Sequence, residues 1–171
     1  MIEQLQGLLE QEPFNKIKHT AFLRGWALKN VSLLYWVKPT VTEISETTVA
    51  VKIPLNRRTR NHLKSMYFGA LATGADCAAG YVAFKLAADM RPLKFSTVFK
   101  DFKAEFLKRP EGDVVFTCDQ AAEVRELMQR AAETPGERLE YTCQIRATVP
   151  SLDPEIIVAK FELTLSVKCK S

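Results

Sequence analysis

Residues 69–86 read GALATGADCAAGYVAFKL, and this stretch decides the fold. Small and apolar side chains fill nearly every position, so a helix here would have almost no polar face. A helix that is apolar all round is a buried helix. Its three glycines each disfavour the helix by roughly 1 kcal/mol relative to alanine, but small side chains allow other backbone to approach closely. We therefore expect one buried central helix.

The segments around this helix alternate between apolar and polar residues with a period of two. Such alternation indicates antiparallel strands with one face on a core and one face in water. The expected strands cover residues 47–55, 98–107, 113–118, 139–149 and 157–169. In the second of them the inward side is expected to hold Val98, Phe102, Ala104 and Phe106. The prediction is an α+β fold in which a long, curved antiparallel sheet wraps around the central helix.

Three further segments favour helices. Apolar residues recur at helical spacing over residues 14–34, and residues 120–133 form a polar amphipathic pattern that ends at Thr134. Residues 3–11 suit a short helix before Pro13. No linker or repeat divides the chain, so we expect a single domain. It spans residues 1–171, with a helical extension over 1–32 and the core over 33–169.

Composition restricts the class of protein. The chain has 171 residues, 47% of them hydrophobic, and a net charge of +4, which is too small an excess to indicate nucleic-acid binding. Four cysteines lie far apart without a C-x-x-C pair and only two histidines are present, so neither a disulfide framework nor a metal site or cofactor is expected. No signal peptide or membrane-spanning segment is evident. These features predict a cytoplasmic protein without a membrane partner.

Asp76 is the residue most informative about function. It is the only formal charge between Lys64 and Lys85. A carboxylate inside an apolar helix is costly to desolvate unless a reaction uses it or a donor pairs with it. Both readings remain open from the residue alone. Asn61, fifteen positions earlier, is by itself more typical of a turn or a helix cap than of a catalytic group.

Residues 61–76 resemble the motif of the PaaI-like thioesterases of the hotdog superfamily. That motif has an Asn, a spacer, His-Gly-Gly, and an acid within the central helix. Asn61 and Asp76 match the Asn-to-acid spacing and Gly69 matches the second Gly, while Phe99–Pro110 resembles the strand that follows the central helix. The match is closer to the uncharacterised DUF4442 type, whose motif begins Asn-His, and it covers roughly residues 33 to 169.

Two positions depart from the thioesterase motif. Tyr67 stands where the family usually has His, and Phe68 stands where it has the first Gly. In such enzymes the donor to the oxyanion is a backbone N–H at the start of the central helix. The N–H groups of Phe68 or Gly69 are expected to serve here, because a helix start leaves its first N–H groups unpaired.

The resemblance implies hydrolysis of an acyl-CoA or acyl-carrier thioester by a homodimer, or by a tetramer built from two dimers. Asp76 would be the general base or nucleophile, and Asn61 would orient the attacking water or the thioester. Both subunits would contribute to each site. The residues expected to bind substrate are Tyr67, Thr73, Arg57, Arg58 and Arg60, of which Thr73 would hydrogen-bond Asp76 and the arginines would meet the phosphates of coenzyme A or of phosphopantetheine.

Other functions fit parts of the pattern. A non-catalytic hotdog protein that binds an acyl or aromatic ligand, or only assembles with partners, is consistent with the departures at Tyr67 and Phe68. The arginines can equally belong to a solvated loop. Cys77 and His62 offer a nucleophile–base pair, but Cys77 would point about 100° away from Asp76 around the helix. A hydratase on the same fold would need an acidic partner for His62, which the sequence does not supply.

Overall fold

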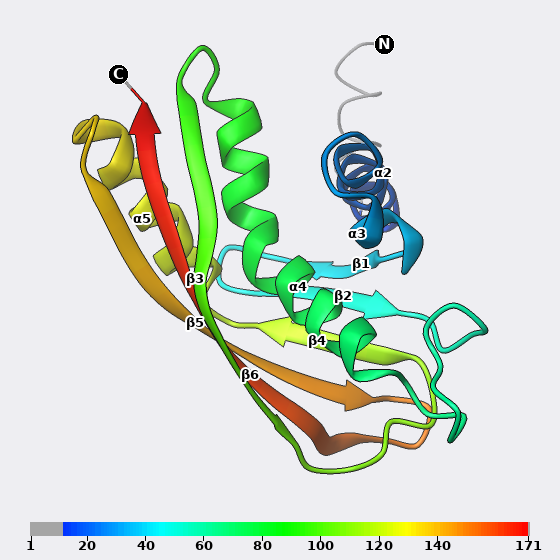
Figure 1. Cartoon of the computed structure of the whole chain (residues 1–171). Coiled ribbons are helices and arrows are strands. Elements are labelled where there is room, and N and C mark those ends of the chain that lie inside the picture. The colour runs from blue at the N-terminus through cyan, green and yellow to red at the C-terminus, as the bar shows by residue number, and fades with distance from the viewer. Residues whose placement is uncertain (1–11, 171) are drawn as a thin grey trace, which may run out of the picture.

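The computed structural model describes residues 12–170. Six strands form one antiparallel sheet in the order β1-β2-β4-β5-β6-β3 (Figure 1). In chain order the elements are α2 (Glu12–Asn30), α3 (Ser32–Trp36), β1 (Thr40–Ile44), β2 (Val49–Ile53), α4 (Phe68–Asp89), β3 (Lys94–Phe106), β4 (Val114–Cys118), α5 (Ala121–Glu133), β5 (Arg138–Val149) and β6 (Asp153–Lys170).

Helix α4 is the central helix that the sequence predicts. The long strands bend around it, and α5 packs beside it to complete a single hydrophobic core (Figure 1). Most of α4 from Ala70 to Ala83 is buried. The period-two pattern also holds on β5 and β6, where alternate side chains such as Ile145 and Phe161 are buried against the helices. The predicted α+β architecture of a curved antiparallel sheet around a buried helix is confirmed.

Gly74 allows α4 to approach the sheet closely. A Cβ atom at this position would lie 2.2 Å from the ring of Phe116, which is fully buried on β4 and packs against Phe161. The Phe116 ring has no free space to move into, since cores are packed to near-crystalline density. The absence of a side chain at Gly74 therefore sets the distance between helix and sheet.

We expect Gly74→Ala to destabilise the protein, although alanine is the better helix former. Overpacking against Phe116 should cost about 1–3 kcal/mol of unfolding free energy. The matched control is Gly25→Ala in α2, where a Cβ meets nothing within 4 Å, and this variant should be neutral or slightly stabilising. Thermal unfolding of the two variants checks the contrast. Equal melting temperatures would contradict it.

The first edge of the sheet is covered by α2. The hydroxyl of Thr20 accepts a hydrogen bond of 2.9 Å from the N–H of Val41. Arg24 donates from Nε to the carbonyl oxygen of Pro39 at 2.8 Å and from a terminal nitrogen to the hydroxyl of Thr40 at 2.9 Å. These contacts satisfy backbone groups that an edge strand otherwise presents to another chain.

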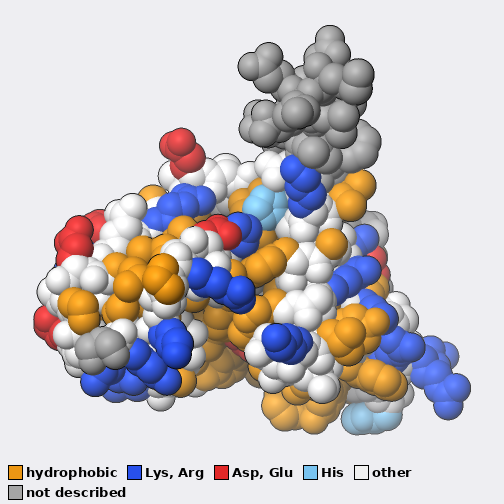
Figure 2. All heavy atoms as spheres, turned by 90° about the horizontal axis from the view of Figure 1, so that it is seen from above, with side chains coloured by type: hydrophobic (Ala, Val, Ile, Leu, Met, Phe, Trp, Pro, Cys, Tyr) orange, Lys and Arg blue, Asp and Glu red, His pale blue; other side chains and the backbone are white. Residues whose placement is uncertain are grey.

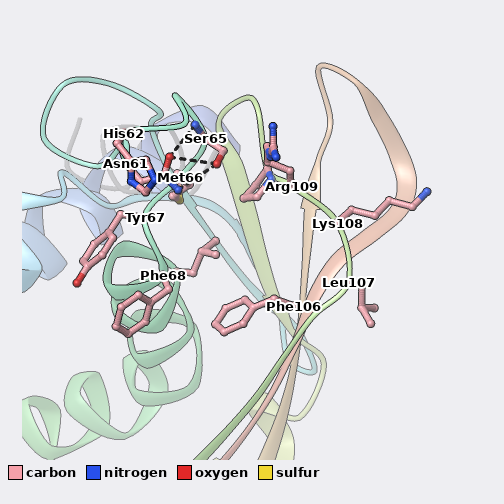
Figure 3. Close-up of a pocket in the computed structure, with 12 residues that line it drawn as sticks. Asn61, His62, Ser65, Met66, Tyr67, Phe68, Phe106, Leu107, Lys108 and Arg109 are labelled. Carbon is pink, nitrogen blue, oxygen red and sulfur yellow. Dashed lines mark hydrogen bonds between the residues drawn. The ribbon is translucent and has the colours of Figure 1, made fainter.

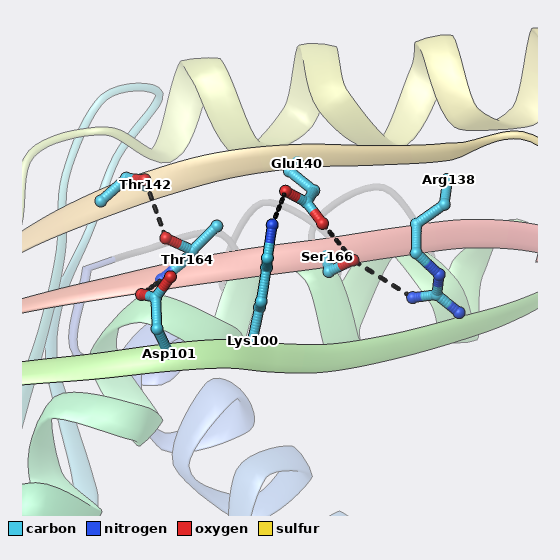
Figure 4. Close-up of polar contacts among 7 residues, drawn as sticks. All are labelled: Lys100, Asp101, Arg138, Glu140, Thr142, Thr164 and Ser166. Atoms are coloured by element: carbon cyan, nitrogen blue, oxygen red, sulfur yellow. Dashed lines mark hydrogen bonds and ion pairs between the residues drawn. The ribbon is translucent and has the colours of Figure 1, made fainter.

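Within residues 12–170 the opposite edge strand, β3, has no such cover, and it contains a bulge that changes which side chains face the core. Phe99 pairs with Leu165 and Phe102 with Leu163, so Lys100 and Asp101 together oppose Thr164. The carboxylate of Asp101 accepts a 3.2 Å hydrogen bond from the N–H of Thr164 (Figure 4). The bulge is thus held by a side chain of the extra residue.

The prediction for Val98 is wrong because of this bulge. Val98 opposes Ser166 on the outer face of the sheet and is 51% exposed, whereas Phe102 and Phe106 face the same side as α4. A simple period of two assigned all three to one face. The outer face around Val98 is polar, and Figure 4 shows Lys100 reaching Glu140 on β5, at 2.8 Å, while Ser166 joins the same network.

The remaining predictions, of helices and strands, differ from the structure in detail. The predicted helix over 14–34 is divided into α2 and α3, and the strand β1 was not predicted at all. The five segments predicted as strands correspond to β2 to β6. The helix expected over 3–11 lies outside the described residues.

Candidate active site

Asp76 lies on the exposed side of α4. The residues before and after it, Ala75 and Cys77, are fully buried, but Asp76 is only partly buried. One and two turns earlier on the same helix face are Ala72, also partly buried, and Phe68, which is 60% exposed. Toward the start of α4, the helix face that carries the carboxylate is therefore only partly covered by the described residues 12–170.

Burial raises the pKa of the Asp76 carboxyl to about 6, because removing the charged form from water is unfavourable. No residue within 12–170 pairs with it, since desolvation is the only cause of the shift and no hydrogen bond or ion pair reaches the carboxylate. The reading in which Asp76 merely pairs with a neighbouring donor is thus not supported by the described part of the chain. A desolvated, unpaired carboxyl with a raised pKa has the properties of a general base.

The start of α4 presents unpaired backbone donors. Tyr67 is the N-cap residue and no side chain caps the helix. The N–H groups of Ala70 and Leu71 donate to the carbonyl oxygen of Tyr67, whereas those of Phe68 and Gly69 donate to no group in the described residues. Two free N–H groups at the positive end of a helix form a site for an oxyanion.

A pocket of about 510 Å³ opens beside these donors (Figure 3). Its walls come from three segments: the loop before α4, the first turn of α4, and the chain at the end of β3. Figure 3 shows the rings of Phe68 and Phe106 on the two sides of the space, with Lys108 and Arg109 on the segment that follows β3. The pocket has a largely apolar interior, and Lys108 and Arg109 lie at its margin, with the side chain of Lys108 directed away from the space between the two rings (Figure 3).

Asn61 lines this pocket but is held by its own loop. Its side-chain oxygen accepts hydrogen bonds from the N–H groups of Leu63, at 2.9 Å, and Ser65, at 3.2 Å. Its amide nitrogen donates to the hydroxyl of Ser65 at 3.1 Å (Figure 3). Asn61 therefore shapes the loop that leads into α4, in addition to lying at the pocket wall.

Thr73 and Tyr67, which were both expected to bind substrate, lie in different surroundings. The hydroxyl of Thr73 donates to the carbonyl oxygen of Gly69 at 2.7 Å, so the expected bond to Asp76 is not formed. The reason is local, because a threonine within a helix readily bonds the carbonyl four residues back. Tyr67 is 47% exposed and lines the pocket, where its ring lies against Phe68.

The three arginines of the preceding loop do not line this pocket. Arg57, Arg58 and Arg60 are exposed, and the guanidinium of Arg58 lies over the ring of Trp36, 4.6 Å from its centre. Lys108 and Arg109 supply the basic groups instead. Sequence reasoning missed these two as site residues, although the resemblance of Phe99–Pro110 to a family strand gave the signal.

The loop and the strand end are joined by backbone bonds. The N–H of Met66 donates to the carbonyl oxygen of Pro110, and the N–H of Tyr67 donates to that of Thr59. The first bond brings residues more than forty positions apart in the sequence to one wall, and the second holds the loop before α4 together.

A model of the DUF4442 family, described as a domain of unknown function, matches residues 22–167. The chain belongs to the DUF4442 family. No curated protein is similar to it in sequence. The match includes both Asp76 and the whole wall of the pocket, so the site lies within the family domain and not in an added segment.

Solved structures place this DUF4442 domain in the hotdog fold. A "putative thioesterase" of Shewanella oneidensis superimposes with a TM-score of 0.72 at 12% identity, over 88% of this chain and 98% of the other. A probable thioesterase of Pseudomonas aeruginosa gives 0.65 at 20% identity, over 88% and 95%. A thioesterase of Haemophilus influenzae gives 0.58 at 17% identity, over 83% and 86%. At such identities the likeness establishes the fold alone.

One alternative for the DUF4442 domain, Cys77 as the nucleophile, loses its support. Cys77 is fully buried, and burial together with nearby Asp76 raises the pKa of its thiol, so it is not an activated nucleophile. Within residues 12–170 there is also no cluster of three or more His, Cys, Asp or Glu side chains placed to hold a metal ion. No helix in the same range is both long and apolar enough to span a bilayer.

Proposed function

We propose that this protein hydrolyses an acyl thioester, with Asp76 as general base or nucleophile. The observation that carries the proposal is an unpaired, desolvated carboxyl on the open face of α4, with a pKa of about 6. The reaction needs such a group to activate water or to attack the carbonyl carbon, and it needs donors for the oxyanion that forms. The free N–H groups of Phe68 and Gly69 are suited to the second task.

One protomer cannot use both parts of the site on the same carbonyl. Asp76 lies eight residues after Phe68, which corresponds to ~12 Å along a helix. A general base must come within hydrogen-bond reach of the attacking water. In an antiparallel pair of protomers, α4 of one would place its first N–H groups beside Asp76 of the other. We therefore propose that the active form is a homodimer, or a tetramer of two dimers.

The uncovered edge of the sheet supports this assembly. Strand β3 has thirteen residues, and Phe102 and Phe106 on its α4 side are 45% and 54% exposed. Exposed apolar side chains beside an uncovered edge strand form a surface that another chain can bury. Pairing of β3 with its copy would continue the sheet across the two protomers and bring the open faces of both α4 helices together.

Within this function, the expected substrate-binding residues keep distinct roles. The pocket beside Tyr67 would hold the part of the substrate next to the thioester, and Asn61 would fix the loop that forms its wall. Lys108 and Arg109 at the margin would attract the phosphates of coenzyme A or of a phosphopantetheine carrier. Arg57, Arg58 and Arg60 lie outside this lining and would at most attract the carrier at longer range.

The direct test is release of free thiol from a panel of acyl-CoA and acyl-carrier thioesters. The panel should include short, long and aromatic acyl groups, since the identity of the acyl group is open. Hydrolysis of at least one thioester, lost on substitution of Asp76, is the expected result. Failure to hydrolyse any of them would leave a hotdog protein that binds its ligand without chemistry, and would overturn the proposal.

The pH dependence of hydrolysis should follow the Asp76 carboxyl. A general base works only when deprotonated, so kcat/KM should fall about tenfold for each pH unit below about 6 and level off above it. The direction of this pH dependence follows from the raised pKa. Because the pKa is raised, the inactive protonated form of Asp76 persists to a higher pH than that of an ordinary Asp. Rates measured from pH 4.5 to 8.5 provide the check, and a profile without a break near pH 6 would argue against Asp76 as the base.

A further inference from the structure

A second hollow, of about 460 Å³, lies at the far end of α4 from the pocket beside Asn61. Three elements enclose it: α2, the last turns of α4, and the start of β3. It shares no lining residue with the first pocket. Seen from above, the molecule is hollowed between two lobes, with hydrophobic side chains inside the depression and basic ones at its margins (Figure 2).

The inner wall of this hollow is aromatic and held in place. The rings of Trp26 and Phe84 stack with their centres 4.4 Å apart and only 13° between their planes. Phe84 lies so close above Gly80 that a Cβ at that glycine would be 2.6 Å from its ring. Phe22 and Phe95 complete the apolar lining. A wall of this kind favours a flat aromatic ligand, because contacts between rings add to the free energy gained from burial of apolar area.

The margin of the hollow is positively charged. Lys29 on α2 and Arg91 after α4 both line it, and no acidic residue does. Neither cation forms a hydrogen bond or ion pair with a residue of the described range, whereas the nearby Lys85 is paired with Asp89. Two cations without a partner among the described residues, at the margin of an apolar hollow, favour the binding of a ligand with an anionic group.

We propose that this hollow binds a small aromatic anion, an aryl group that carries a carboxylate. The ring would lie against the Trp26–Phe84 stack and the carboxylate would face Lys29 and Arg91. This goes beyond the proposed hydrolysis, because Asp76 and the free N–H groups of α4 are not part of the lining.

The test is a titration of the full chain with 3-phenylpropanoate, followed by calorimetry and by indole fluorescence. The chain has two tryptophans, so a Trp36→Phe background leaves Trp26 as the only indole reporter. We expect saturable binding with a change in Trp26 emission. The neutral analogue 3-phenylpropanol and the aliphatic anion octanoate should each bind at least ~10-fold more weakly.

Two sets of variants separate this site from the rest of the molecule. Trp26→Ala and the double substitution Lys29→Gln/Arg91→Gln should each weaken binding at least ~10-fold. The double substitution alters only exposed side chains, so this variant retains the fold. Arg57→Gln, an exposed cation outside the hollow, and Asp76→Asn should bind as the wild type does. The proposal is overturned by the absence of binding at millimolar probe, by equal affinity for the alcohol or for octanoate, or by binding that the double substitution leaves unchanged.

Discussion

Substitution of Asp76 by Asn should lower kcat for thioester hydrolysis by ~10³-fold while leaving the fold intact. A group that transfers a proton or forms a covalent intermediate typically contributes 10²–10⁴-fold to the rate, and no other carboxyl is placed on the open face of α4 beside Asp76. The matched control is Asp89→Asn on the same helix, where the carboxylate is exposed and paired with Lys85. That variant should retain hydrolysis.

Asp76→Asn should also raise the stability of the protein at neutral pH. The folded state holds the Asp76 proton more tightly than the unfolded state, because the pKa rises from 3.8 to about 6 on folding. Stability is therefore lost as pH rises through this interval, and the ionised carboxylate costs the folded state about 1–3 kcal/mol above it. Thermal unfolding at pH 7.5 should show a higher melting temperature for the variant, and the difference should shrink toward pH 4.

These two readouts together separate catalysis from structure. An Asp76→Asn variant that is both inactive and less stable at pH 7.5 would show that the carboxylate holds the fold. A variant that hydrolyses thioesters at the wild-type rate would remove Asp76 from the mechanism.

Substitution of Phe102 by Glu should dissociate the dimer and abolish hydrolysis with it. Phe102 faces the α4 side of the uncovered strand β3, where the partner protomer would bury it. A carboxylate in an apolar interface without a partner costs about 3 kcal/mol or more, which corresponds to a dimer weaker by ~100-fold. Hydrolysis should fall in parallel, because Asp76 would lose the oxyanion donors of the second protomer.

Val98→Glu is the matched control for this experiment. Val98 is on the same strand and is similarly exposed, but the bulge at Lys100 and Asp101 turns it to the outer face of the sheet. Light scattering after size-exclusion chromatography should find a monomer for Phe102→Glu and a dimer for Val98→Glu. A monomeric wild type, or a monomeric Phe102→Glu variant with full activity, would contradict the proposed shared site.

Local pattern predicted much of this fold because its signals lie within single elements. Residues 69–86 have no polar face, and the resulting buried helix α4 is present. The alternation over residues 139–149 matches β5 and sets which of its faces meets the core. Strand β1 was missed since five residues after Pro39 carry too short a pattern to be distinguished from a loop. Val98 was misplaced because one extra residue reverses the alternation.

For the candidate site as well, local sequence pointed to some residues and missed others. Asp76 stood out in the sequence, as an isolated charge in an apolar run is unusual wherever it lies. The position of Lys108 and Arg109 beside the pocket did not stand out, because nothing local shows that the end of β3 returns to the start of α4. The bond from the N–H of Met66 to the carbonyl oxygen of Pro110 joins these segments, and such long-range pairing has no local signature.

The sequence by itself determined the buried helix, the faces of the regular strands and the presence of one costly carboxyl. These features follow from the spacing of polar and apolar side chains, because residues on one face recur every 3.6 positions in a helix and every two positions in a strand. Only the tertiary structure decided that, within residues 12–170, α2 covers one sheet edge and leaves β3 open, and that Asp76 stays partly exposed without a partner in that range. Those outcomes depend on how distant segments pack, because exposure and pairing are properties of the assembled surface.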